Sequence, residues 1–276
     1  MPVLTPTDVR ALLTEHRLRP SRALGQHFLA DPNTAQRIAR IAEVGPGDRV
    51  LEIGAGLGSL TLALAATGAE VLAVEIDRSL VPALRDVVAD ADGVTVEEGD
   101  ALTYDLRSRL GDGAWSCVSN LPYNVATPVV LRLLTDVPQI TRMVVMVQRE
   151  VGERLVAEPG TKAYGVPSVR VAYHADARLC GAVPASVFVP RPNVESVLVC
   201  LERRATPPVD VPSPERMFDL VQTGFAQRRK MLRRSLRPAL GADTDAVLEA
   251  AGVDPRARAE QLGLQQWAAL TRKGTR

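Results

Sequence analysis

The stretch RVLEIGAGLGSLT, residues 49–61, predicts a β-strand that runs through a glycine loop into a helix. Residues 50–53 are an apolar strand apart from Glu52. The loop that follows holds Gly54, Gly56 and Gly58. Glycines let a backbone approach a ligand closely, and the amides of a helix N-terminus can bind it. The spacing G-x-G-x-G differs from the G-x-G-x-x-G of dinucleotide binders, so this motif alone is compatible with NAD, a flavin or a nucleoside.

Acidic residues end the next two predicted strands. Residues 71–77 form an apolar strand that ends in Glu75, twenty-one residues after Gly54. An acid at this place can accept both hydroxyls of a ribose. Asp100 follows the strand at 94–98 and can take the exocyclic amine of an adenine, although a lone Asp is more often a helix cap or turn residue.

The fourth strand, residues 115–118, leads into Asn120-Leu-Pro-Tyr123. The side-chain oxygen of Asn120 and the carbonyl of Leu121 can both accept from an amine, because Pro122 fixes the backbone and has no N–H. Tyr123 offers a ring for stacking on a purine. A proline turn with a core tyrosine is the alternative. Four consecutive strand ends with ligand-type residues favour a doubly wound, mostly parallel α/β sheet that binds adenosine along its carboxyl edge.

The rest of the chain divides into segments of different character. Further strands are expected at 142–148, 168–173, 177–180 and 196–201, and helices at 5–20 and 33–43. The segment from Phe188 to Pro192 is loop-like, so periodicity places Phe188 outside the core, with stacking and packing as equal alternatives. Helices alone follow the Pro-rich linker, at 214–226, 228–240, 243–251 and 265–272. We therefore expect an α/β domain over 1–202 with an N-terminal arm at 1–30, a linker at 203–213, and a small all-helical domain at 214–276.

Charge is unevenly spread over the 276 residues, whose formal net charge is +1. From Arg191 onward, 15 Lys/Arg stand against 10 Asp/Glu, which suggests a polyanionic partner, or else a solvated helix face. The candidate phosphate contacts are Arg17, Arg19 and Arg22 in an irregular stretch, and Arg228, Arg229, Lys230, Arg233 and Arg234 in the helix expected at 228–240, where the spacing aligns several of them on one face.

The three cysteines, Cys117, Cys180 and Cys200, form no CxxC or Cys/His cluster, so neither a disulfide framework nor a metal site is expected. A reducing cytoplasm fits this usage. No signal pattern or membrane-length apolar run is present, so we expect no membrane partner.

Motifs spread from Gly25 to Arg237 together resemble one family. In order they are GQ-x-FL, LEIGAGLG, VEID, GDA, NLPYN, MVQREV, FVPRPNVES and QRRKMLR. The chain resembles the KsgA (RsmA) family of small-subunit ribosomal RNA adenine dimethyltransferases. The resemblance implies a class I (Rossmann-like) methyltransferase fold and S-adenosylmethionine as methyl donor. It implies transfer of two methyl groups to N6 of each of two adjacent adenosines, in the 3′-terminal hairpin loop of 16S rRNA, during small-subunit maturation. It implies that residues 1–202 form the catalytic domain, which binds S-adenosylmethionine, and that residues 214–276 form an RNA-binding domain. A monomer that acts on the immature subunit is expected.

The resemblance also implies roles for single residues. The positions that match the family's cofactor contacts are His27, Leu29, Gly54, Glu75, Asp100 and Asn120. His27 departs from the family, which usually has Asn there. Tyr123 and Phe188 match the residues that stack on the target base. Two rivals remain. One is a 23S rRNA adenine methyltransferase of the macrolide-resistance type, and the other is a non-catalytic ribosome-assembly factor.

Overall fold

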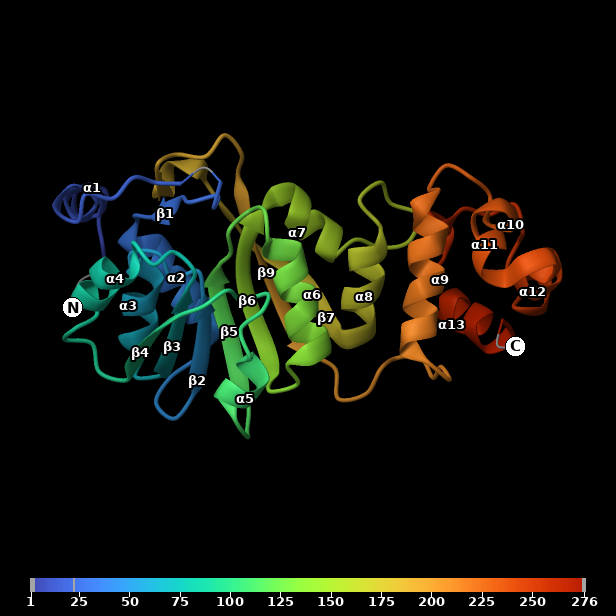
Figure 1. The fold of residues 1–276 in the computed structure, drawn as a ribbon, viewed down its shortest axis with the longest axis horizontal. Coiled ribbons are helices and arrows are strands. Elements are labelled where there is room, and N and C mark those ends of the chain that lie inside the picture. Colours follow the sequence, from blue (N-terminus) through green and yellow to red (C-terminus); the bar gives the residue numbers. More distant parts are fainter. Residues whose placement is uncertain (1–2, 22, 275–276) are drawn as a thin grey trace. The chain divides into compact units, whose positions relative to one another are not determined.

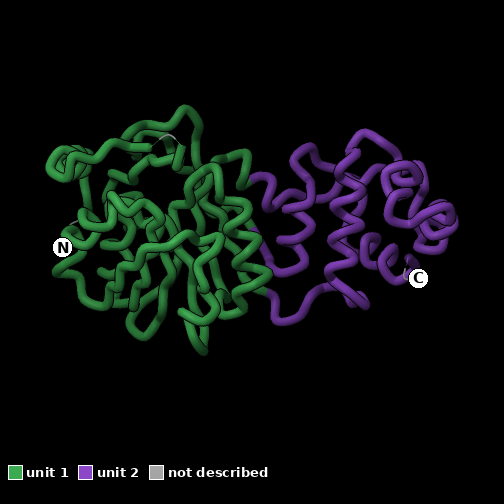
Figure 2. The backbone as a smooth tube through the Cα atoms, viewed as in Figure 1, with its two compact units in different colours: residues 1–152, 178–203 green, residues 153–177, 204–276 purple. Residues whose placement is uncertain are grey.

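The computed structural model describes residues 3–21 and 23–274, which form two compact units (Figure 2). The first holds residues 1–152 and 178–203, and the second holds residues 153–177 and 204–276. The helices are α1 (Pro6–Glu15), α2 (Pro32–Ala42), α3 (Ser59–Ala65), α4 (Val81–Val87), α5 (Leu106–Leu110), α6 (Ala126–Asp136), α7 (Arg149–Leu155), α8 (Val166–His174), α9 (Pro214–Ala226), α10 (Leu232–Ser235), α11 (Arg237–Leu240), α12 (Thr244–Ala250) and α13 (Leu264–Lys273). The strands are β1 (Phe28–Leu29), β2 (Arg49–Ile53), β3 (Glu70–Glu75), β4 (Val94–Glu98), β5 (Trp115–Asn120), β6 (Ile140–Gln148), β7 (Ala175–Val183), β8 (Phe188–Val189) and β9 (Ser196–Arg203).

The first unit is built on a sheet whose described strands run in the order β4-β3-β2-β5-β6-β9-β7, with helices packed on it (Figure 1). The pairs from β4 to β6 are parallel, and β9 lies antiparallel to β6. From β2 the chain moves outward in one direction through β3 and β4, and then returns to β5 on the other side of β2. In such sheets the ligand crevice lies where the strand order reverses, outside the carboxyl ends of the strands. That point lies between β2 and β5, as a doubly wound fold requires.

A small antiparallel pair joins the N-terminal arm to the segment before β9. β1 pairs with β8, and Leu29 is opposite Phe188. Phe188 is only 3% exposed and belongs to the main core of the first unit. The expectation that Phe188 lies outside the core was wrong, because two-residue strands are too short to show periodicity and the pairing is with a residue far away in sequence.

The second unit is helical and has its own core around Trp267. Tyr164 donates from its hydroxyl to the carbonyl of Leu262 (2.8 Å), and Gly160 donates from its N–H to the carbonyl of Glu260 (2.7 Å). These bonds tie residues 153–177 to the C-terminal helices. The packing therefore divides the chain differently from the expected 1–202 domain, although the change at Arg203/Arg204 falls at the start of the expected linker.

Two expected elements of this unit were wrong. Residues 168–173 lie in helix α8, not in a strand, because Pro167 stands in its first turn and Ser168 accepts from the N–H of Gly165 (3.0 Å). The helix expected at 228–240 is instead a turn followed by α10 and α11. The N–H of Leu232 donates to the carbonyl of Ala257 (2.8 Å), so it cannot continue α9.

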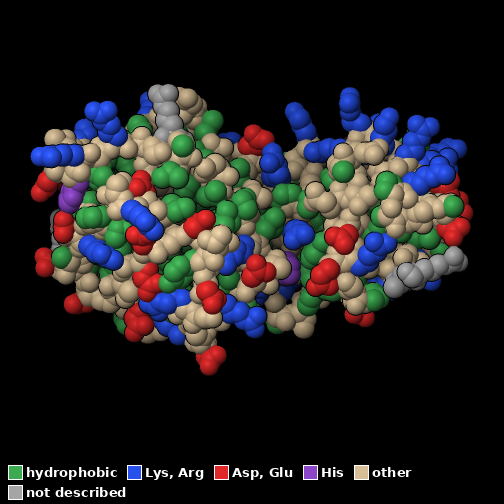
Figure 3. All heavy atoms as spheres, in the orientation of Figure 1, with side chains coloured by type: hydrophobic (Ala, Val, Ile, Leu, Met, Phe, Trp, Pro, Cys, Tyr) green, Lys and Arg blue, Asp and Glu red, His purple; other side chains and the backbone are tan. Residues whose placement is uncertain are grey.

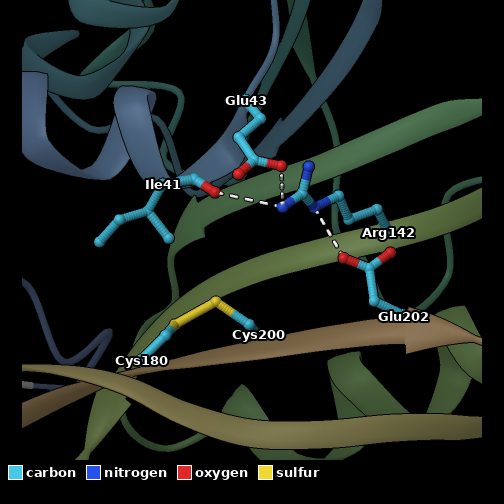
Figure 4. Close-up of a disulfide and its surroundings, with 6 residues drawn as sticks. All are labelled: Ile41, Glu43, Arg142, Cys180, Cys200 and Glu202. Carbon is cyan, nitrogen blue, oxygen red and sulfur yellow. Dashed lines mark hydrogen bonds and ion pairs between the residues drawn. A yellow bond between two sulfur atoms is a disulfide. The ribbon is translucent and has the colours of Figure 1, made fainter.

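A disulfide joins Cys180 of β7 to Cys200 of β9, with their Cα atoms 6.0 Å apart (Figure 4). The expectation of no disulfide was wrong, since the wide sequence spacing conceals that β7 and β9 are neighbours in the sheet. Cys117 is free and buried, and burial raises the pKa of its thiol to about 12. Beside the disulfide, Arg142 bridges Glu43 and Glu202 at 2.9 Å each (Figure 4). Among the described residues no helix is long and apolar enough to cross a membrane.

Candidate active site

The glycine loop and the acid of β3 hold each other in place. Glu75, which is 4% exposed, accepts from the N–H of Gly56 (2.8 Å) with one oxygen and from the N–H of Asp77 (2.9 Å) with the other. Burial raises the pKa of Glu75. Gly54 has a positive φ of 71°, and a Cβ added there would stand 3.2 Å from a carbon of Pro122. The loop therefore needs glycine at this position, and it lies against the Asn-Leu-Pro-Tyr motif.

Glu52 is a second buried acid, which the sequence analysis treated only as an interruption of β2. It is 1% exposed and accepts from the hydroxyl of Thr61 on α3 (2.6 Å). Burial raises the pKa of Glu52 to about 8. The signal for it was a single carboxylate inside an apolar strand, directly before a glycine loop.

Two adjoining pockets open at this edge of the sheet, and Leu24, Gly54, Ile76 and Pro122 line both. The first pocket is lined among others by His27, Leu29, Glu52, Glu75 and Asn120. The second is lined among others by Asp100, Leu102, Val125 and Val129. The structure thus gathers all the residues expected to contact the cofactor around one continuous crevice.

Ile76 lies between the two pockets and is 45% exposed, which is unusual for a large apolar side chain. The sequence analysis missed it, although an apolar residue directly after a strand-end acid was the available signal. An exposed apolar side chain there suits the flat face of a base.

The crevice fits S-adenosylmethionine, the cofactor that the family resemblance implies. Glu75 keeps unused lone pairs that can accept ribose hydroxyls. Ile76, Leu102 and Val129 offer apolar surface for an adenine, and Asp100 stands beside them with an acceptor for its amine. A sulfonium or ammonium group in the first pocket would favour the charged form of Glu52, which lines that pocket. Among the described residues no group of three or more His, Cys, Asp or Glu could hold a metal ion.

The Asn-Leu-Pro-Tyr motif begins at the last residue of β5. The amide nitrogen of Asn120 donates to the carbonyl of His27 (3.3 Å), which leaves its side-chain oxygen available as an acceptor. Leu121 is buried and donates from its N–H to the carbonyl of Met146 (3.1 Å). The hydroxyl of Tyr123 lies 2.9 Å from that of Ser196, and burial raises the pKa of Tyr123.

His27 contacts three parts of the site. Its ring lies against that of Tyr123 with centroids 5.4 Å apart and planes 29° apart. Its Nδ1 is 2.7 Å from the carbonyl oxygen of Pro190. Phe188, in contrast, is buried and lines neither pocket, so its stacking on a target base stays a prediction.

The basic residues fall into two groups. Arg228 pairs with Glu260 (2.7 Å) and donates to the carbonyl of Lys162 (2.7 Å), and Arg233 pairs with Asp245 (3.1 Å). The expectation that these arginines lie on one helix face was wrong, because no helix runs through 228–231. Between residues 228 and 237, the exposed cations with no acidic partner among the described residues are Arg229, Lys230, Arg234 and Arg237.

Figure 3 shows lysine and arginine side chains gathered along the edge of the second unit that holds α10 and α11. In the first unit, Arg17 and Arg19 are exposed on the N-terminal arm. Arg22 lies outside the described residues.

Comparisons with known proteins cover nearly the whole chain. Residues 17–273 match the family described as ribosomal RNA adenine dimethylase. The "Ribosomal RNA small subunit methyltransferase A" of Thermobifida fusca is 49% identical over 97% of this chain and 95% of its own. The protein of the same name from Moorella thermoacetica is 43% identical over 98% of both chains.

Solved structures agree with the fold. The crystal structure of the 23S rRNA methyltransferase ErmE covers 89% of this chain and 98% of its own, with 28% identity and a TM-score of 0.67. A dimethyladenosine transferase from Plasmodium falciparum covers 88% of this chain and 96% of its own, with a TM-score of 0.73 and 23% identity, and so supports the fold alone. With a family match over nearly all of its length and relatives close to half identical, the chain belongs to the ribosomal RNA adenine dimethylase family.

Proposed function

We propose that this enzyme transfers methyl groups from S-adenosylmethionine to N6 of two adjacent adenosines in the 3′-terminal hairpin loop of 16S rRNA, during maturation of the small subunit. The observation that carries the proposal is the position of Asn120, which lines the cofactor pocket while its side-chain oxygen remains available for an amine. The enzyme is proposed to act as a monomer on the immature subunit, in the cytoplasm, where that substrate is found.

The adenine amine is a poor nucleophile, because its lone pair is delocalised into the ring. The side-chain oxygen of Asn120 and the carbonyl of Leu121 can accept its two hydrogens and favour a pyramidal nitrogen. S-adenosylmethionine supplies an electrophilic methyl on sulfur. The N–C bond forms as the C–S bond breaks, a neutral thioether leaves, and the amine proton passes to solvent. Alignment of the two groups accounts for most of the rate, so no strong general base is required.

The target base must leave its RNA stack to reach this motif. Tyr123 presents an aromatic ring beside the pocket, and stacking on such a ring contributes about 1–3 kcal/mol per base. We propose that Phe188 supports this wall from the core. The exposed cations of the N-terminal arm and of residues 229–237 are proposed to contact phosphates.

A 23S rRNA methyltransferase of the ErmE type is the second candidate, since its fold matches over most of both chains. The higher identity of the small-subunit relatives favours 16S rRNA instead. A non-catalytic assembly factor is disfavoured by the open crevice and the available acceptor of Asn120.

The test combines the purified protein, radiolabelled S-adenosylmethionine, and small or large subunits from a strain that lacks these methyl groups. We expect four methyl groups per small subunit, and label only in large-subunit RNA would contradict the assignment. Asn120→Ala should lower transfer by about 10²- to 10³-fold, the cost typical of losing one transition-state hydrogen bond, while subunit binding stays nearly unchanged. Loss of subunit binding would contradict the role given to Asn120.

A further inference from the structure

His27 faces both the cofactor pocket and the motif that receives the target base. It lines the first pocket, so its position alone is compatible with a cofactor contact. Within the protein its side chain makes two specific contacts, with the ring of Tyr123 and the carbonyl of Pro190. This raises the question of which of the two substrates the imidazole serves.

The hydrogen bond to Pro190 defines which ring nitrogen of His27 carries the hydrogen. A carbonyl oxygen only accepts, so Nδ1 carries the hydrogen in this contact and a neutral ring has its lone pair on Nε2. Pro190 follows the short strand that pairs with the N-terminal arm. The imidazole is therefore held in one orientation by a segment that is far away in sequence.

Tyr123 is held at two places. Its hydroxyl is 2.9 Å from the hydroxyl of Ser196, and its ring packs against the ring of His27 at an interplanar angle of 29°. A tyrosine ring whose hydroxyl is held by one hydrogen bond can still rotate about its Cβ–Cγ axis. A neighbour on the ring itself restricts that rotation and sets where the flat surface lies.

The backbone of His27 acts on the same motif. Its carbonyl accepts from the amide of Asn120 at 3.3 Å. One residue of the N-terminal arm thus contacts both the proposed amine acceptor and the proposed stacking ring, and its side chain links them to the segment after β8.

On the basis of the proposed function, we propose that His27 is a positioning residue for the target adenine: its imidazole sets the plane of Tyr123, and its role is not to hold S-adenosylmethionine. Replacing it should impair methyl transfer to the bound base and leave the cofactor affinity almost unchanged. This differs from the family resemblance, which places the residue among the cofactor contacts.

The experiment compares four full-length variants with the wild type: His27→Ala, His27→Phe, Tyr123→Ala and the double variant His27→Ala/Tyr123→Ala. Affinity for S-adenosylhomocysteine is measured by calorimetry, and the rate of transfer to saturating small subunits is measured in a single turnover. His16→Ala on the N-terminal arm is the matched control, since His16 pairs with the exposed carboxylate of Asp86 (3.6 Å) and lines neither pocket.

We expect His27→Ala to slow transfer about tenfold, since small misplacements of reacting groups have effects of this size, and to change cofactor affinity by less than about twofold. His27→Phe keeps an aromatic ring beside Tyr123 and should recover most of the rate. In the Tyr123→Ala background, His27→Ala should have little further effect, because the two residues act as one unit. If His27→Ala folds poorly, His27→Phe alone is compared with the wild type, and its rate should stay within about threefold at an unchanged cofactor affinity.

Three outcomes would overturn the inference: a cofactor affinity that falls in parallel with the rate, effects that multiply in the double variant, or a His27→Phe variant as slow as His27→Ala. Failure of the proposed function looks different, since the wild-type protein itself would then transfer no label to small subunits.

Discussion

The carboxylate of Glu75 accepts a hydrogen bond from the N–H of Gly56 at 2.8 Å, so the acid that ends β3 fixes the glycine loop that follows β2. Its other oxygen accepts from Asp77 at 2.9 Å. Glu75→Gln should therefore weaken cofactor binding, because the amide has only one oxygen and would turn its NH₂ toward one of these donors. We expect the Kd for S-adenosylhomocysteine to rise about 10- to 100-fold, as for loss of a charged hydrogen bond, measured by calorimetry.

Glu70→Gln is the matched control for this change. Glu70 is exposed at the opposite end of the same strand, so its replacement should leave the Kd unchanged. A Glu75→Gln variant with wild-type affinity would show that the loop keeps its shape without the carboxylate.

Burial of Glu52 predicts a pH-dependent cost to stability. The pKa of Glu52 is raised to about 8 in the folded protein, from 4.5. Between these two values the folded chain binds more protons than the unfolded chain, so the contribution of this group to stability falls as pH rises and is fully lost above pH 8. The Tm of Glu52→Gln minus that of wild type should therefore become more positive from pH 5 to pH 8 in thermal scans. A constant difference across this range would contradict the prediction.

The sequence was most informative where local pattern and topology agree. Parallel strands end at the same edge of a sheet, so Gly54, Glu75, Asp100 and Asn120 could be expected to meet before any contact was known. Their individual roles remain predictions. In contrast, the place of the exposed Ile76 between the two pockets follows only from the shape of the crevice.

Where long-range contacts decide, the sequence was misleading. Residues 168–173 alternate valine with other side chains like a strand, but Pro167 and Ser168 start a helix whose Val169 and Tyr173 lie on one buried face. Phe188 and the disulfide both depend on pairing between distant strands. The basic stretch from Arg228 has the spacing of a helix, but the N–H of Leu232 donates to the carbonyl of Ala257, so no single helix runs through it.

Arg132 should support the adenine end of the crevice, although it lines neither pocket. Its guanidinium donates to the carbonyl of Tyr104 (2.8 Å) and to that of Ala101, and so holds the loop that carries Asp100. Val129, which lines the second pocket, lies three residues before Arg132 on the same side of α6, and Val125, which also lines this pocket, is the N-cap residue of that helix. Arg132→Met should weaken S-adenosylhomocysteine binding about tenfold in calorimetry, because the loop loses both bonds.

Arg85→Met on the exposed face of α4 is the control and should bind like wild type. Combining Arg132→Met with Asp100→Ala distinguishes the mechanism. If Arg132 acts through this loop, the two losses should not add. Fully additive losses would mean that Arg132 acts elsewhere.

The two groups of basic residues in the second unit predict different effects. Replacing the unpaired Arg229, Lys230 and Arg234 by alanine should weaken binding to small subunits and lower the slope of log K against log salt by about one per lost phosphate contact. Arg228→Ala should instead lower the Tm, because it removes the contacts with Glu260 and Lys162. Filter binding from 50 to 300 mM salt and thermal scans separate the two effects. An unchanged salt slope in the triple variant would show that this surface makes no phosphate contacts with the subunit.

The disulfide between Cys180 and Cys200 predicts a chain with a single reactive thiol after denaturation without reductant. Alkylation followed by intact-mass measurement should then show one label, on Cys117, and three labels after reduction. The bond closes a loop across a separation of 20 residues, and by the loop-entropy estimate such a cross-link stabilises a fold by about 3 kcal/mol. Cys180→Ser/Cys200→Ser should therefore lower the Tm to the value that the wild type shows with reductant, while Cys117→Ser keeps the response to reductant. Since β9 and β7 come after β6 in the strand order and do not flank the crevice between β2 and β5, we expect cofactor affinity to be the same in both redox states. A change in that affinity on reduction would show that the disulfide influences the crevice.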